Sequence, residues 1–315
     1  MSASAIVVTH NSAPEIETCL SALARTGISL CVVDNASTDE TVNIVRRVAP
    51  DAVIVGNYVN LGFAAAVNQA LLCVEHSEVL LVNPDCVLPE STAWAMLDTL
   101  SADPTLGIVG PQLVNARGRL VVSAHPFETV SRLIVSRFGG SLVPLSVKRK
   151  IARLNGLRKS RPPDSDGVLI DVDWLSGACL AVRTNLLKGI GGLDDGYFMY
   201  YEDVELCWQA REAGLRVAQI SGAEALHLGG ASSRDPAHLW PHLYRSLLRY
   251  HRLRNPQSYS IVRAVVFARA VLGLVLAGLR VVRGQVPEGR RRAQAWWRVA
   301  GLTLRSADPQ SVECE

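Results

Sequence analysis

The chain has 315 residues, of which 49% are hydrophobic and 19% are charged, and its formal net charge is +3. Such a chain can bury a substantial core, so a disordered or low-complexity protein is excluded. Its seven cysteines include no CxxC pair and stand mostly within apolar runs, which argues against cysteine-bound zinc and favours free thiols in a reducing cytosol. No basic stretch precedes an apolar run at the N-terminus, so no export peptide is predicted.

The charge is distributed unevenly along the chain. Residues 245–305 hold 13 arginines and one acid, Glu288, whereas residues 1–236 sum to −6. A second basic run without acids covers residues 148–161. Basic runs are usually solvated loops, but beside an apolar tail they favour an anionic membrane surface or a pyrophosphate-bearing acceptor, and no nucleic-acid partner is expected.

The first 110 residues alternate β-branched apolar runs with helical patterns. Capping boxes are predicted at the starts of the first two helices, in Ser12 with Glu15 and in Ser37 with Glu40. Buried strands joined by helices indicate an α/β fold, with a mostly parallel, Rossmann-like sheet and right-handed crossovers. The strands are expected at residues 5–8, 30–33, 53–55 and 79–82.

Polar residues follow each of these expected strands. In a parallel sheet the ligand binds beyond the carboxyl ends of the strands, so we expect these residues to line one crevice. The polar segments are Thr9-His10-Asn11, Asp34-Asn35, residues 57–62 and Asn83-Pro84-Asp85.

The middle of the chain changes in character. Residues 115–170 are rich in loop-forming residues and predict an insertion that covers the crevice. A turn and a strand are expected over residues 174–182. The pair Glu202-Asp203 then opens a helix that ends at Gly214.

Residues 261–283 are apolar but are interrupted by four arginines. On a helix these arginines fall within an arc of about 160°, which predicts an amphipathic helix rather than a membrane span. Arg290-Arg291-Arg292 and Trp296-Trp297 follow, a combination that suits the headgroup layer of a membrane. The alternative is a helix that packs on the catalytic domain or on a second subunit, as in a homodimer.

Several familiar catalytic motifs are missing from the sequence. It contains no GxxxxGK[ST] loop, no GxGxxG after the first strand, no GxSxG elbow and no HExxH helix. The common kinase, dehydrogenase and hydrolase interpretations therefore lose their main support. Isolated acids at element ends remain, namely Asp34, Asp85 and the pair Glu202-Asp203.

Asp85 stands where it could bind a hard divalent cation, which a diphosphate leaving group requires. The tripeptide Asn83-Pro84-Asp85 is also an ordinary turn sequence. His227 could be a ligand of the metal or the pyrophosphate, although a histidine between two leucines is more often a packed residue.

Asp203 stands at the expected start of a helix. The positive end of the helix dipole keeps a carboxylate ionised there, so that it can take a proton from an attacking hydroxyl. The alternative is that Glu202 and Asp203 only favour the helix start.

Taken in order, seven segments resemble the family 2 glycosyltransferases with the GT-A fold, and more narrowly their bacterial rhamnosyltransferase branch. The resemblance covers about residues 4–232 and is specific because the segments agree in order and spacing. It implies a GT-A catalytic domain over residues 1–236, with a nucleotide-binding half (1–110) and an acceptor half (111–236), followed by a basic helical extension (237–315). The segments are VVTHN, VVDNASTDET, NLGFAAAVNQAL, LLVNPDC, WLSGACLAVR, GGLDDGYFMYYEDVELCWQAREAG and HLGG.

The resemblance implies roles for residues in the nucleotide-binding half. Thr9, His10 and Asn11 border the nucleotide, Asp34 binds its base, and Asn60 and Gly62 also touch it. Asn83 and Asp85 take the place of the family's usual DxD, from which the chain departs at Asn83. Asp85 would bind Mg²⁺ or Mn²⁺.

It also implies roles in the acceptor half. Asp203 would be the general base, and Glu202 would help to hold the acceptor or the base. Trp174 and Gly177 would face the sugar and the acceptor. His227 would complete the metal or diphosphate site.

The implied reaction is an inverting transfer, with dTDP-L-rhamnose favoured as donor, to a lipid-linked or cell-envelope glycan. The enzyme would work as a peripheral protein on the cytoplasmic face of the membrane. One alternative keeps this chemistry with a UDP- or GDP-sugar. A second is a non-catalytic membrane-peripheral scaffold with the same fold, against which the intact acids argue. A nucleotidyltransferase would release pyrophosphate, but no glycine-rich, arginine-bearing loop follows the first strand.

Overall fold

The structure is a computed structural model that describes residues 3–138, 167–229 and 236–304. Contacts divide them into a sheet unit, residues 3–126, 167–198 and 202–229, and a helical unit, residues 127–138, 199–201 and 236–304. The helical unit therefore takes in two short segments that precede residue 237. The basic run 148–161 and half of the predicted covering insertion, residues 139–166, lie outside the described residues.

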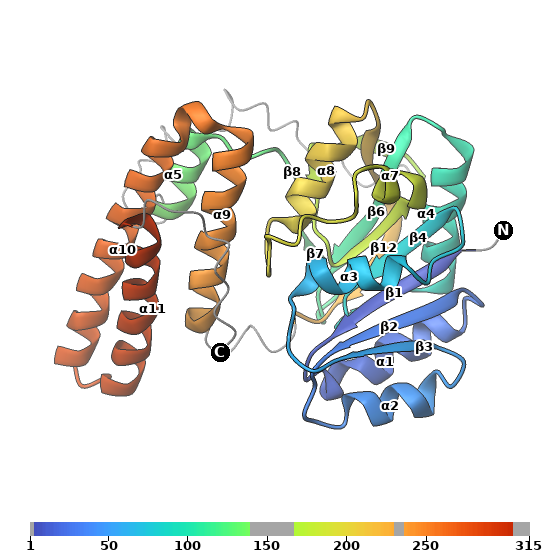
Figure 1. Cartoon of the computed structure of the whole chain (residues 1–315), viewed down its shortest axis with the longest axis horizontal. Helices are drawn as coiled ribbons and strands as arrows, with labels where there is room; N and C mark the ends of the chain where they lie inside the picture. The colour runs from blue at the N-terminus through green and yellow to red at the C-terminus, as the bar shows by residue number, and fades with distance from the viewer. Residues whose placement is uncertain (1–2, 139–166, 230–235, 305–315) are drawn as a thin grey trace. The chain divides into compact units, whose positions relative to one another are not determined.

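The sheet unit is built on a mixed sheet whose N-terminal half is parallel (Figure 1). Its first four strands pair in the order β3-β2-β1-β4, all in parallel, as the sequence predicted. They are β1 (Ser4–Thr9), β2 (Ser29–Asn35), β3 (Val53–Asn57) and β4 (Glu78–Val82). The register places Thr9 opposite Asp34, and Asn35 opposite Asn57, so polar residues meet where the strands end.

The second half of the sheet contains antiparallel pairs. β11 (Cys179–Arg183) lies antiparallel between β4 and β6 (Leu106–Val114), and β12 (Arg216–His227) continues the sheet in parallel with β6. β5 (Cys86–Val87) and β9 (Leu169–Asp171) pair antiparallel with β12, and β7 (Leu120–Val121) with β6. A separate small sheet joins β8 (Ala124–His125) to β10 (Trp174–Leu175).

Helices cover both faces of the sheet, which explains why its central strands are apolar throughout. Side chains alternate along β1, so Ala5 and Val7 join one apolar cluster and Ile6 and Val8 the other. The first cluster includes residues of α1 (Ala13–Ala24), α2 (Thr41–Val48) and α4 (Glu90–Ala102). The second includes residues of α3 (Phe63–Leu71), α7 (Thr184–Gly189) and α8 (Glu202–Glu212).

Both predicted capping boxes are wrong. Neither serine caps its helix; the Asp39 carboxylate instead accepts hydrogen bonds from the Ala13 N–H at the start of α1 (3.2 Å) and from the Thr41 N–H at the start of α2 (3.0 Å). The Ser12 hydroxyl instead accepts a hydrogen bond from the His10 N–H (3.3 Å), and the Ser37 hydroxyl accepts one from the Asn11 N–H (2.8 Å). Ser12 therefore bonds within its own loop and Ser37 bonds to the neighbouring loop, so that both serines hold the loops at the strand ends.

The helical unit consists of packed helices around a small apolar core. Its helices are α5 (Val130–Phe138), α9 (Trp240–Arg254), α10 (Tyr259–Val282) and α11 (Val286–Leu304), with 3₁₀ turns at Pro236–Leu239 and Pro256–Ser258. Leu133, Leu247, Val262 and Val299 lie in the core. Gly273 allows α10 to approach α11, since an added Cβ would lie 2.4 Å from the Trp296 ring.

The arginines of α10 share one face, but this face packs against α11. The Arg269 guanidinium lies 4.3 Å from the centre of the Trp296 ring, Arg263 donates to the Thr303 carbonyl, and Arg280 pairs with Glu288 at 3.0 Å. The exposed side of α10 is therefore largely apolar. Its exposed residues include Ile261, Phe267, Val271, Val275, Leu276, Leu279 and Val282. By length and composition alone, Pro256–Val282 is also apolar enough to cross a membrane, so the predicted amphipathic, non-spanning helix stays a prediction.

Candidate active site

Asp34 lies at the end of β2 and is almost fully buried. Its Oδ1 accepts a hydrogen bond from the Thr9 hydroxyl (3.0 Å), and its Oδ2 accepts one from the Ser37 N–H (3.0 Å). Each carboxylate oxygen still has one lone pair free for a donor such as a nucleotide base. The structure therefore fixes Asp34 beside Thr9 at the edge where the sequence predicted the nucleotide.

His10 and Asn11 form the exposed rim beside Thr9. The His10 Nδ1 lies 2.7 Å from the Asn35 carbonyl oxygen. Asn11 has a φ of 50°, in the left-handed region that asparagine tolerates, and its Oδ1 accepts a hydrogen bond from the Thr38 N–H (2.8 Å). This loop is closely held by hydrogen bonds before any ligand arrives.

Gly62 connects this edge to the start of α3. Its N–H donates to Asn60 Oδ1 (2.9 Å), and its carbonyl accepts a hydrogen bond from Asn35 Nδ2 (3.0 Å). With a φ of 85°, and with a Cβ position 2.4 Å from the Phe198 carbonyl oxygen, only glycine fits here. Sequence reasoning noticed Asn35 and Asn57 but gave them no role, although Asn57 Nδ2 donates to Asn35 Oδ1 (2.9 Å) across the strand register.

Asp85 lies within a tight turn between β4 and β5, in which the Cys86 N–H donates to the Asn83 carbonyl (3.0 Å). The turn interpretation of the sequence is thus correct, yet the turn also presents Asp85 to His227. Asp85 Oδ2 lies 3.3 Å from His227 Nε2, because the antiparallel register of β5 and β12 sets His227 opposite Cys86. The hydrogen bond to Asp85 raises the pKa of His227, although burial opposes the shift.

The Asp85–His227 pair offers one carboxylate and one imidazole, both of which ligate divalent ions such as Mn²⁺. Within the described ranges, no group of three or more His, Cys, Asp or Glu side chains could hold a metal ion. The pair therefore fits an ion whose remaining ligands come from diphosphate oxygens and water. Burial and the charge of Asp85 raise the pKa of Glu15, so excess negative charge already gathers around this pair.

Asp203 lies in the first turn of α8 with both carboxylate oxygens held by backbone donors. The Gly177 N–H donates to Oδ2 (2.9 Å), and the Val204 N–H donates to Oδ1 (2.8 Å). A Cβ at position 177 would lie 3.1 Å from the Asp203 Cβ, so glycine permits this close approach. The Asn83 N–H donates to the Ala178 carbonyl (2.9 Å), which joins this region to the turn that carries Asp85.

Glu202 and Asp203 line a small cavity whose other walls are largely apolar. Burial raises the pKa of Asp203, while its two backbone donors oppose the shift. Burial and the charge of Asp203 raise the pKa of Glu202 to about 8. Near neutral pH Glu202 is therefore mostly protonated, and the two backbone donors favour the ionised form of Asp203. The remaining wall residues are Phe63, Leu81, Gly177, Leu180, Leu193 and Leu206.

Trp174 lies half-buried in β10. Its indole N–H donates to the Pro126 carbonyl (3.1 Å), and its ring stacks on His125 with centroids 4.3 Å apart and an interplanar angle of 18°. Burial lowers the pKa of His125, so the stacked imidazole stays neutral. Sequence reasoning missed His125, whose partner comes from a strand distant in sequence.

The chain is similar to known proteins in sequence. The family described as Glycosyl transferase family 2 matches residues 4–139. The N-acetylglucosaminyl-diphospho-decaprenol L-rhamnosyltransferase of Mycobacterium tuberculosis is 30% identical over 253 residues, which cover 75% of this chain and 80% of the relative.

Two solved structures share the fold. The mannosyltransferase PcManGT from Pyrobaculum calidifontis, in complex with GDP-Man and Mn²⁺, is 19% identical, with a TM-score of 0.54 over 97% of this chain and 88% of that one. S. aureus TarS 1-349 is 18% identical, with a TM-score of 0.51 over 96% of this chain and 90% of that one.

Proposed function

This chain belongs to the rhamnosyltransferase branch of the family 2 glycosyltransferases, and from that premise we propose that it transfers L-rhamnose from dTDP-L-rhamnose, with inversion, to a lipid-linked glycan. The predicted family, GT-A fold and enzyme class are confirmed. The observation that carries the proposed mechanism is the buried Glu202-Asp203 pair, which holds one ionised carboxylate against the Gly177 N–H.

Asp203 acts as the general base in this mechanism. Its carboxylate removes the proton from the acceptor hydroxyl while that oxygen attacks the anomeric carbon of the donor. The bond from this carbon to the diphosphate breaks at the opposite side, so the configuration inverts and nucleoside diphosphate leaves. The Gly177 and Val204 N–H groups hold the Asp203 carboxylate in one orientation, and protonated Glu202 is available to donate a hydrogen bond to the acceptor.

The strand-end edge binds the nucleotide. Asp34 accepts a hydrogen bond from the base with its remaining lone pairs, beside Thr9. His10 and Asn11 border the nucleotide on the exposed rim, and the Asn60–Gly62 segment contacts it from the start of α3. The hydrogen bonds that these residues already make support the proposal, because a site ordered in advance loses little entropy when the donor binds.

Asp85 and His227 would hold Mg²⁺ or Mn²⁺, and the ion would supply positive charge to the departing diphosphate. Their 3.3 Å approach and the shortage of further protein ligands in the described residues suit an ion that is completed by the donor. Mn²⁺ in the PcManGT complex supports this assignment. Trp174 and Gly177 face the sugar and the acceptor.

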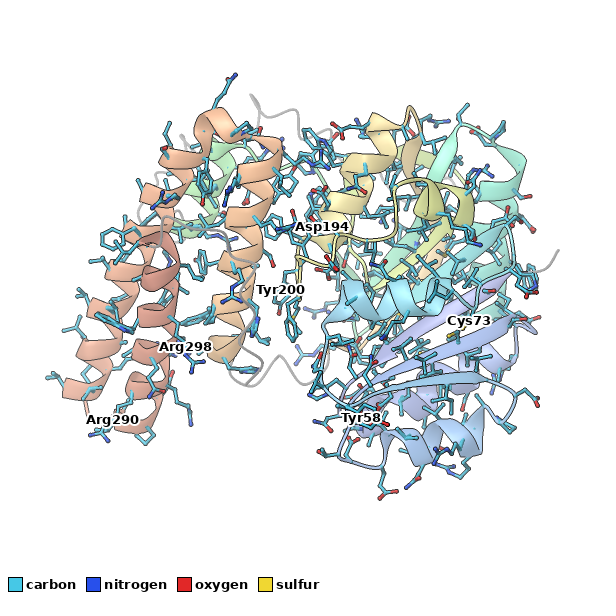
Figure 2. The ribbon with its side chains drawn as sticks, viewed as in Figure 1. Tyr58, Cys73, Asp194, Tyr200, Arg290 and Arg298 are labelled. Atoms are coloured by element: carbon cyan, nitrogen blue, oxygen red, sulfur yellow. The ribbon has the colours of Figure 1, made fainter. Side chains whose placement is uncertain are left out.

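The proposed acceptor is a polyprenyl-diphosphate-linked saccharide at the cytoplasmic face of a membrane. Support comes from the name of the Mycobacterium tuberculosis relative and from the exposed apolar side of α10. We assign catalysis to residues 1–236 and membrane attachment to residues 237–315. Arg290 and Arg298 on α11, labelled in Figure 2, add positive charge that suits anionic headgroups.

The membrane assignment is tested by binding to anionic vesicles. Val275→Glu and Leu276→Glu introduce charge on the exposed side of α10, and we expect most of the bound protein to be released from the vesicles. Undiminished binding would contradict membrane attachment through α10. Loss of a homodimer in the same variants, without loss of binding, would assign this side to a second subunit.

The donor and the reaction are tested together by measuring release of nucleoside diphosphate from dTDP-, UDP- and GDP-sugars, with Mg²⁺ or Mn²⁺ and membrane lipid extract as acceptor. We expect acceptor-dependent release of dTDP from dTDP-rhamnose, and its loss in Asp203→Asn. If only a UDP- or GDP-sugar is turned over, the transferred sugar is not rhamnose, and the proposed donor is wrong. No turnover across the panel would favour the non-catalytic scaffold.

A further inference from the structure

Residues 191–198, which follow α7, are held to helix α3 at two places. In the first turn of α3, the Phe63 N–H donates to the Phe198 carbonyl at 3.0 Å. Farther along the same helix, the Asn68 side chain bonds to Leu193. All of these residues belong to the sheet unit, so the contacts lie within one unit of the chain.

Asn68 bonds to both backbone polar groups of Leu193. Its Oδ1 accepts a hydrogen bond from the Leu193 N–H, and its Nδ2 donates one to the Leu193 carbonyl, each at 2.8 Å. One side chain thus satisfies the backbone of a buried residue, as a neighbouring strand would do in a sheet. The two bonds together fix both the position and the orientation of Leu193.

Gly192 is required for this pairing. It has a φ of 90°, in the left-handed region that favours glycine, and a Cβ there would lie 2.4 Å from Asn68 Oδ1. Its N–H donates to the Leu187 carbonyl at 2.8 Å. The backbone before Leu193 is therefore shaped so that the Asn68 amide can approach it.

The same segment also contacts α8. The Tyr197 side chain is fully buried, and its hydroxyl donates to Glu205 Oε2 at 3.4 Å. Asp194, labelled in Figure 2, accepts a hydrogen bond at Oδ1 from the Gly196 N–H (2.9 Å), which holds the turn before Tyr197. Residues 191–198 therefore connect α3 to the helix that carries the acid pair.

Phe63 and Leu193 belong to the wall of the cavity that Glu202 and Asp203 line. Burial is the larger cause of the raised pKa of Glu202, and the charge of Asp203 is the smaller one. Glu202 Oε2 is buried and has no hydrogen-bond partner among the described residues. Because water would stabilise the ionised form of such a carboxyl group, the apolar wall determines how firmly Glu202 keeps its proton.

We propose that Asn68 is a positioning residue for the acid pair: its amide holds Leu193 in the cavity wall and thereby keeps water from Glu202 and Asp203. The inference rests on the proposed function only in naming Asp203 as the base. Asn68 acts through Leu193 and not on the substrate. A purely structural role would stabilise residues 191–198 and leave the protonation of Glu202 unchanged.

An NMR titration of the side-chain carboxyl groups tests the proposal without any substrate, and the Glu202 signal is identified by its absence in Glu202→Gln. In Asn68→Ala we expect the pKa of Glu202 to fall from about 8 by about two pH units, because water enters the cavity. Gln69→Ala is the matched control, since it removes an amide from the next position of α3, where Nε2 donates to Asn57 Oδ1 at 3.0 Å. It should leave the pKa of Glu202 as in wild type.

Leu193→Ala is a second variant, which opens the wall without changing the Asn68 side chain, and it should lower the pKa of Glu202 as well. Should Asn68→Ala not fold, Asn68→Ser takes its place with the same expectation, because its shorter hydroxyl cannot make both bonds to Leu193. A pKa of Glu202 that stays at the wild-type value in the Asn68 variant would overturn the positioning role. An equal fall in Gln69→Ala would overturn it too.

The transfer assay separates this inference from the proposed function. We expect kcat to fall about tenfold in Asn68→Ala, with the donor KM within about twofold of wild type. If wild type transfers no sugar but the pKa of Glu202 still falls in Asn68→Ala, the proposed function fails and the positioning inference stands. If wild type transfers sugar and neither the pKa of Glu202 nor kcat responds, only the positioning inference fails.

Discussion

Asp34 and Asp203 are both held by two hydrogen-bond donors, yet their surroundings differ. Asp34 lies among the polar side chains at the strand ends, beside Thr9. Asp203 lies in an apolar cavity with a second carboxyl group next to it, and the pKa values of both acids are raised. This difference supports the proposal that the strand-end edge binds the nucleotide and that the start of α8 exchanges a proton.

The largest effect is expected at Asp203, which we propose as the catalytic base. Asp203→Asn keeps the shape of the side chain but cannot accept a proton, so kcat should fall about a thousandfold while the donor KM stays close to that of wild type. Initial rates of nucleoside diphosphate release over a range of donor concentrations measure both constants. Asp34→Asn is the matched variant and should act mainly on the donor KM. A larger kcat loss in Asp34→Asn than in Asp203→Asn would reverse the roles.

The next prediction concerns the rigidity of the strand-end edge. Gly62→Ala combines a left-handed backbone with a Cβ position 2.4 Å from the Phe198 carbonyl oxygen, and should lower the free energy of unfolding by roughly 3 kcal/mol. Gly27→Ala has a φ of 68° but no atom within 4 Å of its Cβ position, so it should cost only about 1 kcal/mol. Denaturant unfolding measures the difference. If Gly62→Ala and Gly27→Ala lose the same unfolding free energy, the backbone at the strand-end edge rearranges at little cost and is not preorganised.

A smaller effect is expected from the contact between Thr9 and Asp34. Thr9→Val leaves a buried carboxylate with one donor fewer, which should cost about 1–2 kcal/mol of unfolding free energy and weaken donor binding. Thr105→Val removes the same kind of bond, a hydroxyl donated to Asp103 Oδ1 at 2.6 Å, at an exposed position. It should cost much less than Thr9→Val, because water replaces the lost donor. Similar costs for the two variants would mean that burial does not strengthen the Asp34 contact.

The sequence predicted the parallel half of the sheet because burial on both faces leaves a local trace, an apolar run that ends in polar residues. Thr9, Asp34 and Gly62 were placed at the strand-end edge in this way, and the structure has them there. The antiparallel insertion of β11 was not, since strand pairing across the second half depends on partners distant in sequence. For the same reason the two leucines beside His227 favoured a packed side chain, and only the family resemblance set His227 at the metal or diphosphate site; the β5–β12 register brings it to Asp85.

Local patterns also failed where a tertiary partner competes. The capping serines bond to loop backbone instead of the helix starts. The arginines of α10 share a face, as the helical spacing predicted, but the aromatic and acidic partners on α11 cover that face and leave the apolar one exposed.

The smallest effect near neutral pH is expected from Glu202→Gln, since the wild-type carboxyl is already protonated there. Its pKa is raised from 4.5 to about 8, so its stabilising contribution is complete below pH 4.5 and is lost as the pH rises through about 8. Wild type should therefore lose unfolding free energy between pH 5 and pH 8 relative to Glu202→Gln, as denaturant unfolding at each pH would measure. Glu212→Gln, at the exposed end of α8, controls for the loss of a charge. Its unfolding free energy should change with pH as that of wild type does. If the unfolding free energies of Glu202→Gln and wild type change with pH in the same way, Glu202 is ionised throughout this range. The contrast between a binding edge and a proton-sharing pair would then not hold.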